Sequence, residues 1–433
     1  MPPILTEKPS LPQLAQDCLS FAEPGTTGFP TRPLSIWEIT SWVLPMAPEH
    51  LRRVLAADPG LPQGSAGSDG GTRWFTATEV AALRRHFAQG RLKARYQPQR
   101  PAASRAPLIA MTGPRGAIGR TTALLHLATA AALSGYRVLV IDADPAGHLA
   151  ESLGAGSGPD SGSNMALLAL IARSCGQHLH RTNASRVDRG EPPQAMAESL
   201  SQALETDIPD LIHPSRWPGL DILPTSQTLM QADLHIASWR GSLQVWQPWT
   251  ALAAGLDEAG LRSRYDLILA DTGRGLGPLA LAVLASADVL LAPVSLTGGG
   301  LAGVGLAGVG AGLDALATAM AALAAEDRMT ARALGRAATA FGGRRLAVLP
   351  VRAGVGSATQ LAGFAAKLGP ALLPAPLPEV PQIAAGAVAQ FYDLDYRDIG
   401  RLTYAPLRQA CEDAWRGVAG IIAGLWAEDA SRI

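Results

Sequence analysis

The chain has 433 residues and carries 36 Lys and Arg against 36 Asp and Glu, so its formal net charge is zero. This length fits two domains with a large core, and the neutral balance excludes nucleic-acid binding driven by overall charge alone. Three cysteines, Cys18, Cys175 and Cys411, lie too far apart to form a metal or redox motif. Because the first residues also lack a secretion signal, we expect a cytoplasmic protein.

After an N-terminal extension, residues 1–30, the sequence predicts a small helical module over residues 31–90. The stretches RPLSIWEITSWVL and APEHLRRVLAAD predict two short helices split near Leu44–Pro45, because a proline ends one helix and suits the first turn of the next. A Gly- and Ser-rich stretch, Pro62–Thr72, resembles a hairpin. Thr76 and Glu79 then form a capping box that opens a third helix.

Helix, turn, helix, wing and helix is the order of winged or MerR-like helix-turn-helix DNA-binding modules. We expect four basic side chains of this module to contact DNA: His50, Arg52, Arg53 and Arg73. The alternative is a small helical docking domain with a solvated basic face.

Residues 91–106 predict a basic linker, since no acidic residue occurs between Glu79 and Asp142. The basic residues in and just before it are Arg84, Arg85, Arg91, Lys93, Arg95, Arg100 and Arg105. Such a proline-bearing segment can lie along DNA phosphates or serve as a solvated tether, and the sequence favours neither.

The remaining residues, 107–433, predict an α/β domain with a mostly parallel sheet. A buried strand, Leu108–Thr112, precedes a loop with glycines at every third position, whose backbone N–H groups can turn around a phosphate. Thr121 and Thr122 open a helix whose N-terminus favours an anion. The pattern predicts a P-loop that binds ATP through Gly116, Ala117, Ile118, Gly119, Arg120, Thr121, Thr122 and Asp142. An ordinary glycine-rich turn is the alternative.

Two further apolar runs, YRVLVI and YDLILA, predict strands of the same sheet. Asp142 and Asp144 follow the first and Asp271 follows the second, where parallel sheets place their chemistry. We expect Thr121 and Asp271 to hold Mg²⁺, the aspartate through water, and Asp144 to orient the attacking water. Each aspartate alone would instead indicate a helix cap or a turn.

Five segments resemble ParA-type partition ATPases, and in particular the RepA proteins of repABC plasmids. GPRGAIGRTT resembles the family's deviant Walker A loop, K-G-G-x-G-K-T-T. YDLILADTGRGLGPLALAVLASADVLLAPV resembles its Walker B region. The other three segments are VLVIDADPAGHLAESLG, HPSRWPGLDILPTSQTLMQAD and QFYDLDYRDIGRLTYAPLRQACEDAW. The likeness extends from Arg32 to Trp426.

The loop departs from the family pattern, because arginines stand at both lysine positions, Arg115 and Arg120, and Ala117 replaces a glycine. Arginine keeps the charge but is bulkier and planar, so we expect ATP binding with weak hydrolysis. The resemblance implies that Asp144, Arg115 and Arg120 are catalytic, with Arg115 reaching across a dimer. Of the basic residues that the family uses for nonspecific DNA binding downstream, only Arg352 is present.

The resemblance implies a partition protein, associated with the nucleoid or a plasmid and not with a membrane. It would bind ATP and Mg²⁺, form a homodimer, bind DNA both specifically and nonspecifically, and act with a ParB/RepB-like centromere-binding protein. Repression of its own operon is a further expectation. One alternative is a degenerate relative with little ATPase activity that acts as a DNA-bound repressor or scaffold. Another is an ATP-dependent small-molecule enzyme, against which the N-terminal module argues.

Two segments lie outside these motifs. The Gly- and Ala-rich stretch Leu296–Ala325 predicts a tightly packed helix rather than a membrane span. The stretch NASRVDRGEPP, residues 183–193, predicts an exposed loop.

Overall fold

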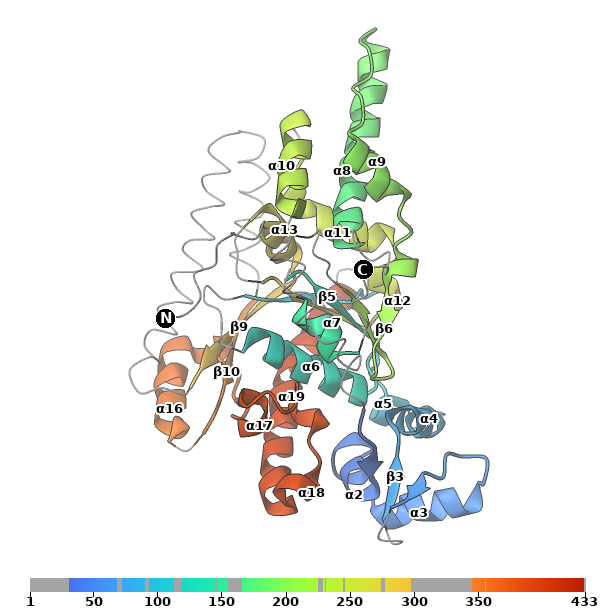
Figure 1. Cartoon of the computed structure of the whole chain (residues 1–433), viewed down its shortest axis with the longest axis vertical. Coiled ribbons are helices and arrows are strands. Elements are labelled where there is room, and N and C mark those ends of the chain that lie inside the picture. Colours follow the sequence, from blue (N-terminus) through green and yellow to red (C-terminus); the bar gives the residue numbers. More distant parts are fainter. Residues whose placement is uncertain are drawn as a thin grey trace, which may run out of the picture.

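The structure is a computed structural model of the chain (Figure 1). It describes residues 31–67, 72–89, 93–112, 119–144, 147–154, 166–224, 229, 231–243, 246–273, 277–296, 345–354 and 356–431. The expected N-terminal extension, nearly all of the expected Gly- and Ala-rich helix, and loop residues 113–118 therefore lie outside the described residues.

The larger part of the chain is built on a seven-stranded sheet. Its spatial order is β10 (Arg345–Val351), β9 (Val289–Ser295), β4 (Leu108–Met111), β8 (Leu267–Asp271), β5 (Val138–Asp142), β7 (Leu220–Leu223) and β6 (His213–Pro214). All neighbours pair in parallel except β6 and β7, which are antiparallel. The predicted α/β class with a mostly parallel sheet is confirmed.

Helices cover both faces of this sheet, as its continuously apolar strands require. Successive residues of β5 point to opposite sides: Leu139 and Ile141 belong to one hydrophobic cluster, and Val138 and Val140 belong to the other. The first cluster is closed by α8 (Ala166–Asp188), α10 (Ala232–Ser242), α11 (Pro248–Glu258) and α13 (Pro278–Ser286). The second is closed by α6 (Arg120–Leu133), α7 (His148–Ser152) and the long α19 (Arg401–Ser431).

Shorter helices complete the described part: α9 (Glu198–Glu205), α12 (Leu261–Arg264), α16 (Ser357–Leu368), α17 (Pro381–Ala384) and α18 (Tyr396–Ile399). The expectation of an exposed loop over residues 183–193 is wrong in its first half, because α8 continues to Asp188. The loop starts only at Arg189 and Gly190, which has a positive φ of 76°. Among the described residues, no helix has the length and apolar character needed to cross a membrane.

Residues 31–96 lie at the lower end of the molecule in Figure 1 and have a small hydrophobic cluster of their own, although Trp74 and Ala77 pack into the second cluster of the main sheet. Its elements are β1 (Leu34–Ser35), α2 (Ile36–Glu38), a π-helical turn (Ile39–Val43), α3 (Pro48–Ala57), β2 (Ser65–Ala66), β3 (Arg73–Phe75) and α4 (Ala77–Phe87). β3 pairs antiparallel with both β1 and β2. We call residues 31–96 the N-terminal module.

Two details of the module test the expected helix boundaries. The capping box of Thr76 and Glu79 is present, with each side chain bonded to the other's backbone N–H. The second helix, α3, runs from Pro48 to Ala57 within the predicted stretch APEHLRRVLAAD, and the proline in its first turn is Pro48. Before it, the Leu44 N–H bonds to the Ile39 carbonyl, an i→i+5 bond that loosens the first helix into a π turn.

The basic segment predicted over residues 91–106 packs against the rest of the protein in its described part. A short helix, α5 (Lys93–Tyr96), buries Tyr96 in the module's core. Arg100 donates to the Arg262 and Ser263 carbonyls and pairs with Asp266 at 3.4 Å. Since these contacts occupy the arginine, this part of the segment is neither a free arm nor a solvated tether.

Candidate nucleotide site and candidate DNA interface

The loop between β4 and α6 enters the helix through Gly119, which has a left-handed φ of 88° that only glycine adopts without strain. Arg120 is the first residue of α6 and is only 7% exposed. The expected phosphate contacts of Arg115, Gly116, Ala117 and Ile118 lie outside the described residues and stay predictions.

Two carboxylates lie beside this helix start, as the sheet order dictates. β8 lies between β4 and β5, and Asp271 at its end is in register with both Met111 and Asp142. The Thr121 hydroxyl donates a hydrogen bond of 2.7 Å to Oδ2 of Asp271. The expected partners of the magnesium site, one on a helix and one on a strand 150 residues away, are therefore in direct contact.

Asp142 is the most unusual group of the site. It is 1% exposed; its Oδ1 accepts the Asp144 N–H at 3.1 Å, and its Oδ2 has no hydrogen-bond partner among the described residues. Burial raises the pKa of Asp142 to about 8, the Asp144 N–H opposes this rise, and the charge of Asp271 adds to it. A buried carboxylate oxygen without a partner suits a divalent cation with oxygen ligands, which would favour the charged form.

Asp271 and Asp144 are the other two carboxylates of the candidate site. Burial raises the pKa of Asp271, while the Thr121 hydroxyl and the Arg120 charge lower it. Asp144 follows β5 and lies against Gly273, where an added Cβ would be 3.3 Å from the Asp144 Cα. Gly273 also has a positive φ of 66°, so close approach and backbone conformation both require glycine there.

A cavity of about 260 Å³ adjoins the first turns of α6. Its lining includes Gly119, Thr122, Arg352 and residues 377–380. Arg352 is exposed and has a left-handed φ of 57°. The fold thus brings Arg352 together with nucleotide-site residues and not with the basic residues of the N-terminal module.

His126 is a member of this site that the sequence analysis missed. Its Nδ1 lies 2.6 Å from the Thr122 carbonyl, and its Nε2 accepts the Phe391 N–H at 3.1 Å. Complete burial lowers the pKa of His126 to about 4, so the ring is neutral and carries its proton on Nδ1. The available signal was a lone histidine in the otherwise apolar run ALLHLATA.

The chain is similar in sequence to a family model and to several known proteins. A family model described as an AAA domain matches residues 106–309. A Sinorhizobium fredii protein named as a replication protein A is 30% identical over 241 residues, which cover 53% of this chain and 49% of the relative. The chromosome partitioning protein ParA of Caulobacter vibrioides is 26% identical over 183 residues, covering 42% of this chain and 54% of the relative.

The chain is similar to ParA/Soj-like partition ATPases and to RepA-like replication proteins. The matched part of the chain spans about half the length of these curated relatives. Among solved structures, an ATP complex of a McdA variant from Cyanothece is 18% identical, with a TM-score of 0.46, and covers 73% of this chain and 97% of that one.

In this ParA-like chain, the four basic side chains expected to contact DNA are all exposed. His50, Arg52 and Arg53 lie on α3, where Arg53 Nη2 is 2.8 Å from His50 Nδ1 and Arg52 pairs with Glu49 at 3.6 Å. Arg73 lies on β3 and donates to the Gln63 side chain at 3.1 Å. Arg52 and Arg73 border one cavity, so the fold brings the helix and the hairpin strand to a common face.

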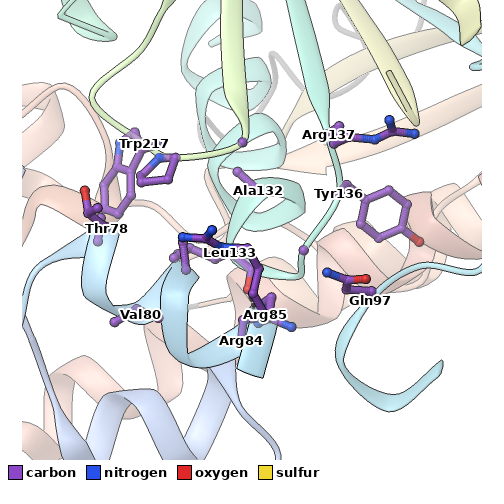
Figure 2. A pocket seen from close by; sticks show the side chains of 15 residues that line it. Thr78, Val80, Arg84, Arg85, Gln97, Ala132, Leu133, Tyr136, Arg137 and Trp217 are labelled. Atoms are coloured by element: carbon purple, nitrogen blue, oxygen red, sulfur yellow. Dashed lines mark hydrogen bonds between the residues drawn. The ribbon is translucent and has the colours of Figure 1, made fainter. Parts of the chain in front are cut away.

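Arg84 joins the N-terminal module to the far end of α6 in this ParA-like chain. It is buried, and its guanidinium donates to the carbonyls of Tyr96, Val43 and Leu133, the last of which is the C-terminal residue of α6. Burial lowers its pKa to about 10. A cavity of about 440 Å³, lined also by Trp217, lies beside it (Figure 2). Listing Arg84 among the basic residues of a segment that can lie along DNA phosphates was wrong, because its guanidinium is buried and bonded to these three carbonyls.

Proposed function

We propose that this chain is a ParA/RepA-like partition protein that binds ATP with Mg²⁺ and binds DNA through its N-terminal module. The observation that carries the proposal is the contact of Thr121 with Asp271 beside Asp142, whose Oδ2 has no hydrogen-bond partner in the part of the chain that the structure describes. A hydroxyl and two carboxylates at the start of a helix after a glycine-rich loop are the donors that a magnesium–phosphate group needs.

The residues present fit such a ligand. Thr121 would bind Mg²⁺ directly and Asp271 would hold it through water, while the N-terminus of α6, together with Arg120 and Thr122, would bind the phosphates. Bound Mg²⁺ would neutralise charge on the phosphates. The cavity lined by Thr122 and Arg352 adjoins the same helix start and offers room for the base and ribose.

Hydrolysis would rest on Asp144, which we propose to orient the attacking water, with Arg115 and Arg120 stabilising charge on the transferred phosphate. Because arginine's planar fork also binds the ground state well, we propose that this activity is slow. A chain with no turnover would act as a DNA-bound repressor or scaffold, which is the second candidate function.

For DNA, we propose a winged helix-turn-helix in which His50, Arg52 and Arg53 of α3 enter or flank the groove and Arg73 contacts the backbone from the hairpin. The exposure of these residues supports this reading over a docking domain. We also propose a homodimer formed across ATP, a ParB/RepB-like centromere-binding partner, association with the nucleoid or a plasmid, and autorepression.

One set of measurements tests the function: ATP turnover of the full chain with and without duplex DNA, in the wild type and in Asp144→Ala. We expect Asp144→Ala to bind ATP but to lose turnover. Equal loss of binding and turnover would assign Asp144 a structural role instead. A wild type whose thermal melt is unmoved by millimolar ATP and Mg²⁺ would refute the nucleotide site itself.

A further inference from the structure

Stacked aromatic rings and arginine guanidinium groups connect the N-terminal module to the C-terminal helices α18 and α19. The Trp74 ring of β3 stacks on the Tyr396 ring of α18 at 5.8 Å with an interplanar angle of 14°. The Arg397 guanidinium lies over Trp74 at 4.3 Å. The Arg401 guanidinium lies over both Trp37, at 4.8 Å, and Tyr396, at 4.9 Å. Each of the three guanidinium contacts places a cation on an aromatic surface.

Arg401 also borders a cavity of about 430 Å³ together with Arg52 and Arg73. The three arginines come from three elements, α19, α3 and β3, that are far apart in sequence. The other described lining residues are Ser35, Ile36, Trp37, Leu55, Ala56, Gln63 and Thr72, and none of these is acidic. Three cations therefore face one cavity whose described lining offers hydroxyl and amide groups and no carboxylate, although Arg52 also pairs with exposed Glu49 at 3.6 Å.

Arg397 and Arg401 differ in one respect that matters for binding. Arg397 donates two hydrogen bonds, of 3.0 and 2.7 Å, to the Asp395 carboxylate, so its charge is already neutralised. Arg401, in contrast, has no carboxylate within salt-bridge distance in the described part of the chain. Its stacked ring partners reduce the freedom that it would lose on binding an anion.

Glu38, which directly follows the lining residues Ser35, Ile36 and Trp37, is bonded to the C-terminal helix. Arg32 Nη2 bonds to Glu38 at 2.6 Å and to the Tyr404 hydroxyl at 2.6 Å, and that hydroxyl donates to Glu38 at 2.8 Å. Tyr404 lies one turn after Arg401 on α19. The module and α19 therefore present Arg52, Arg73 and Arg401 as one preorganised surface.

We propose that Arg401 binds a backbone phosphate of the same DNA duplex that α3 and β3 contact, as the third side of a phosphodiester site with Arg52 and Arg73. The inference rests on the proposed DNA-binding function of the module and extends it to the ATPase domain. It places a DNA contact on α19, which packs against α6, the helix that begins at the nucleotide site.

The test compares Arg401→Gln with Arg397→Gln, two variants that each remove one stacked arginine and one positive charge. Binding of the full chain to duplex DNA is measured over a range of salt concentrations. We expect Arg401→Gln to weaken binding severalfold for all sequences alike and to reduce the slope of log K against log salt by about 1. Arg397→Gln should change that slope by less than half as much, and Arg401→Lys should retain it.

The outcomes separate this inference from the proposed function. If Arg52→Gln and Arg73→Gln weaken binding while Arg401→Gln behaves like Arg397→Gln, only the role of Arg401 is refuted. If none of these variants changes DNA binding, the DNA-binding role of the module is refuted as well. A second arm adds inorganic phosphate at constant ionic strength; stabilisation that needs Arg401, with DNA binding unchanged by Arg401→Gln, would indicate a free-anion site and overturn the inference.

Discussion

The nucleotide site and the N-terminal module use charged side chains in opposite ways. Asp142 and Asp271 are each 1% exposed and Arg120 is 7% exposed, whereas Arg52 and Arg73 are exposed on the surface. Buried charged groups interact at short distances in a low dielectric. Removing one of them therefore changes the free energy of folding or binding by a large amount, and salt has little influence on that change. The charges of exposed groups are screened by solvent and salt. Removing one exposed charge therefore changes the free energy of folding or binding only slightly, and the change depends on the salt concentration. The two regions should therefore respond differently to mutation.

The largest expected effect is a pH dependence from buried His126. Its pKa of about 4 lies below the ordinary 6.5, so the folded state binds fewer protons than the unfolded state between these values. Stability present above pH 6.5 should fall as the pH drops toward 4, by about 3 kcal/mol in all. The measurement is the free energy of unfolding between pH 7 and 4 in the wild type and in His126→Leu, in which the dependence should flatten. His50→Gln, on exposed α3, is the control that should leave the profile unchanged; equal effects would break the comparison.

Next in size is the effect of the site's carboxylate on ligand binding. Asp271→Asn keeps the shape of the side chain but removes the charge that would hold Mg²⁺ through water. We expect ATP with Mg²⁺, at a hundredfold excess over Kd, to stabilise the wild type by about 2.7 kcal/mol and Asp271→Asn by much less. Thermal melts with and without ligand measure both values. An unliganded variant as stable as the wild type shows that the fold is intact, and full ligand stabilisation of that variant would exclude Asp271 from the site.

A smaller effect is expected from Arg120→Lys. A lysine supplies a compact charge that follows the phosphate into the transition state, whereas arginine also stabilises the ground state. We expect turnover to rise by about tenfold, equivalent to ~1.4 kcal/mol. Steady-state ATP turnover at saturating ATP measures it. Robust wild-type turnover that falls in Arg120→Lys would mean that the loop is adapted to arginine.

The smallest effect on stability is expected on the exposed helix α3. Arg52→Gln together with Arg53→Gln should change the free energy of unfolding by less than ~0.5 kcal/mol, because both side chains are exposed. The same pair should reduce the salt slope of DNA binding by about 2. Arg181→Gln on α8, whose guanidinium bonds only its own helix carbonyl in the described residues, is a control that removes one exposed positive charge outside the module. A large loss of stability in the α3 pair would favour a docking interface over a DNA-binding face.

Features that depend on a few neighbouring residues were predictable from the sequence. The apolar runs that became β4, β5 and β8, the capping box at Thr76, and the aspartates directly after the strands all follow from local periodicity and cap chemistry. The positions of Asp142 and Asp271 at one edge of the sheet followed as well, because parallel strands end at the same edge.

Contacts between residues that lie far apart in the sequence were decided only by the tertiary structure. Arg84 and Arg401 are both arginines near aromatic residues in the sequence. Arg84 is nevertheless buried and bonded to three backbone carbonyls, whereas Arg401 lines a cavity together with Arg52. Nothing local distinguishes them, because the partners of each lie on elements far away in the chain. The contact of Thr121 with Asp271 likewise requires β8 to lie between β4 and β5, an order that packing of the whole sheet sets.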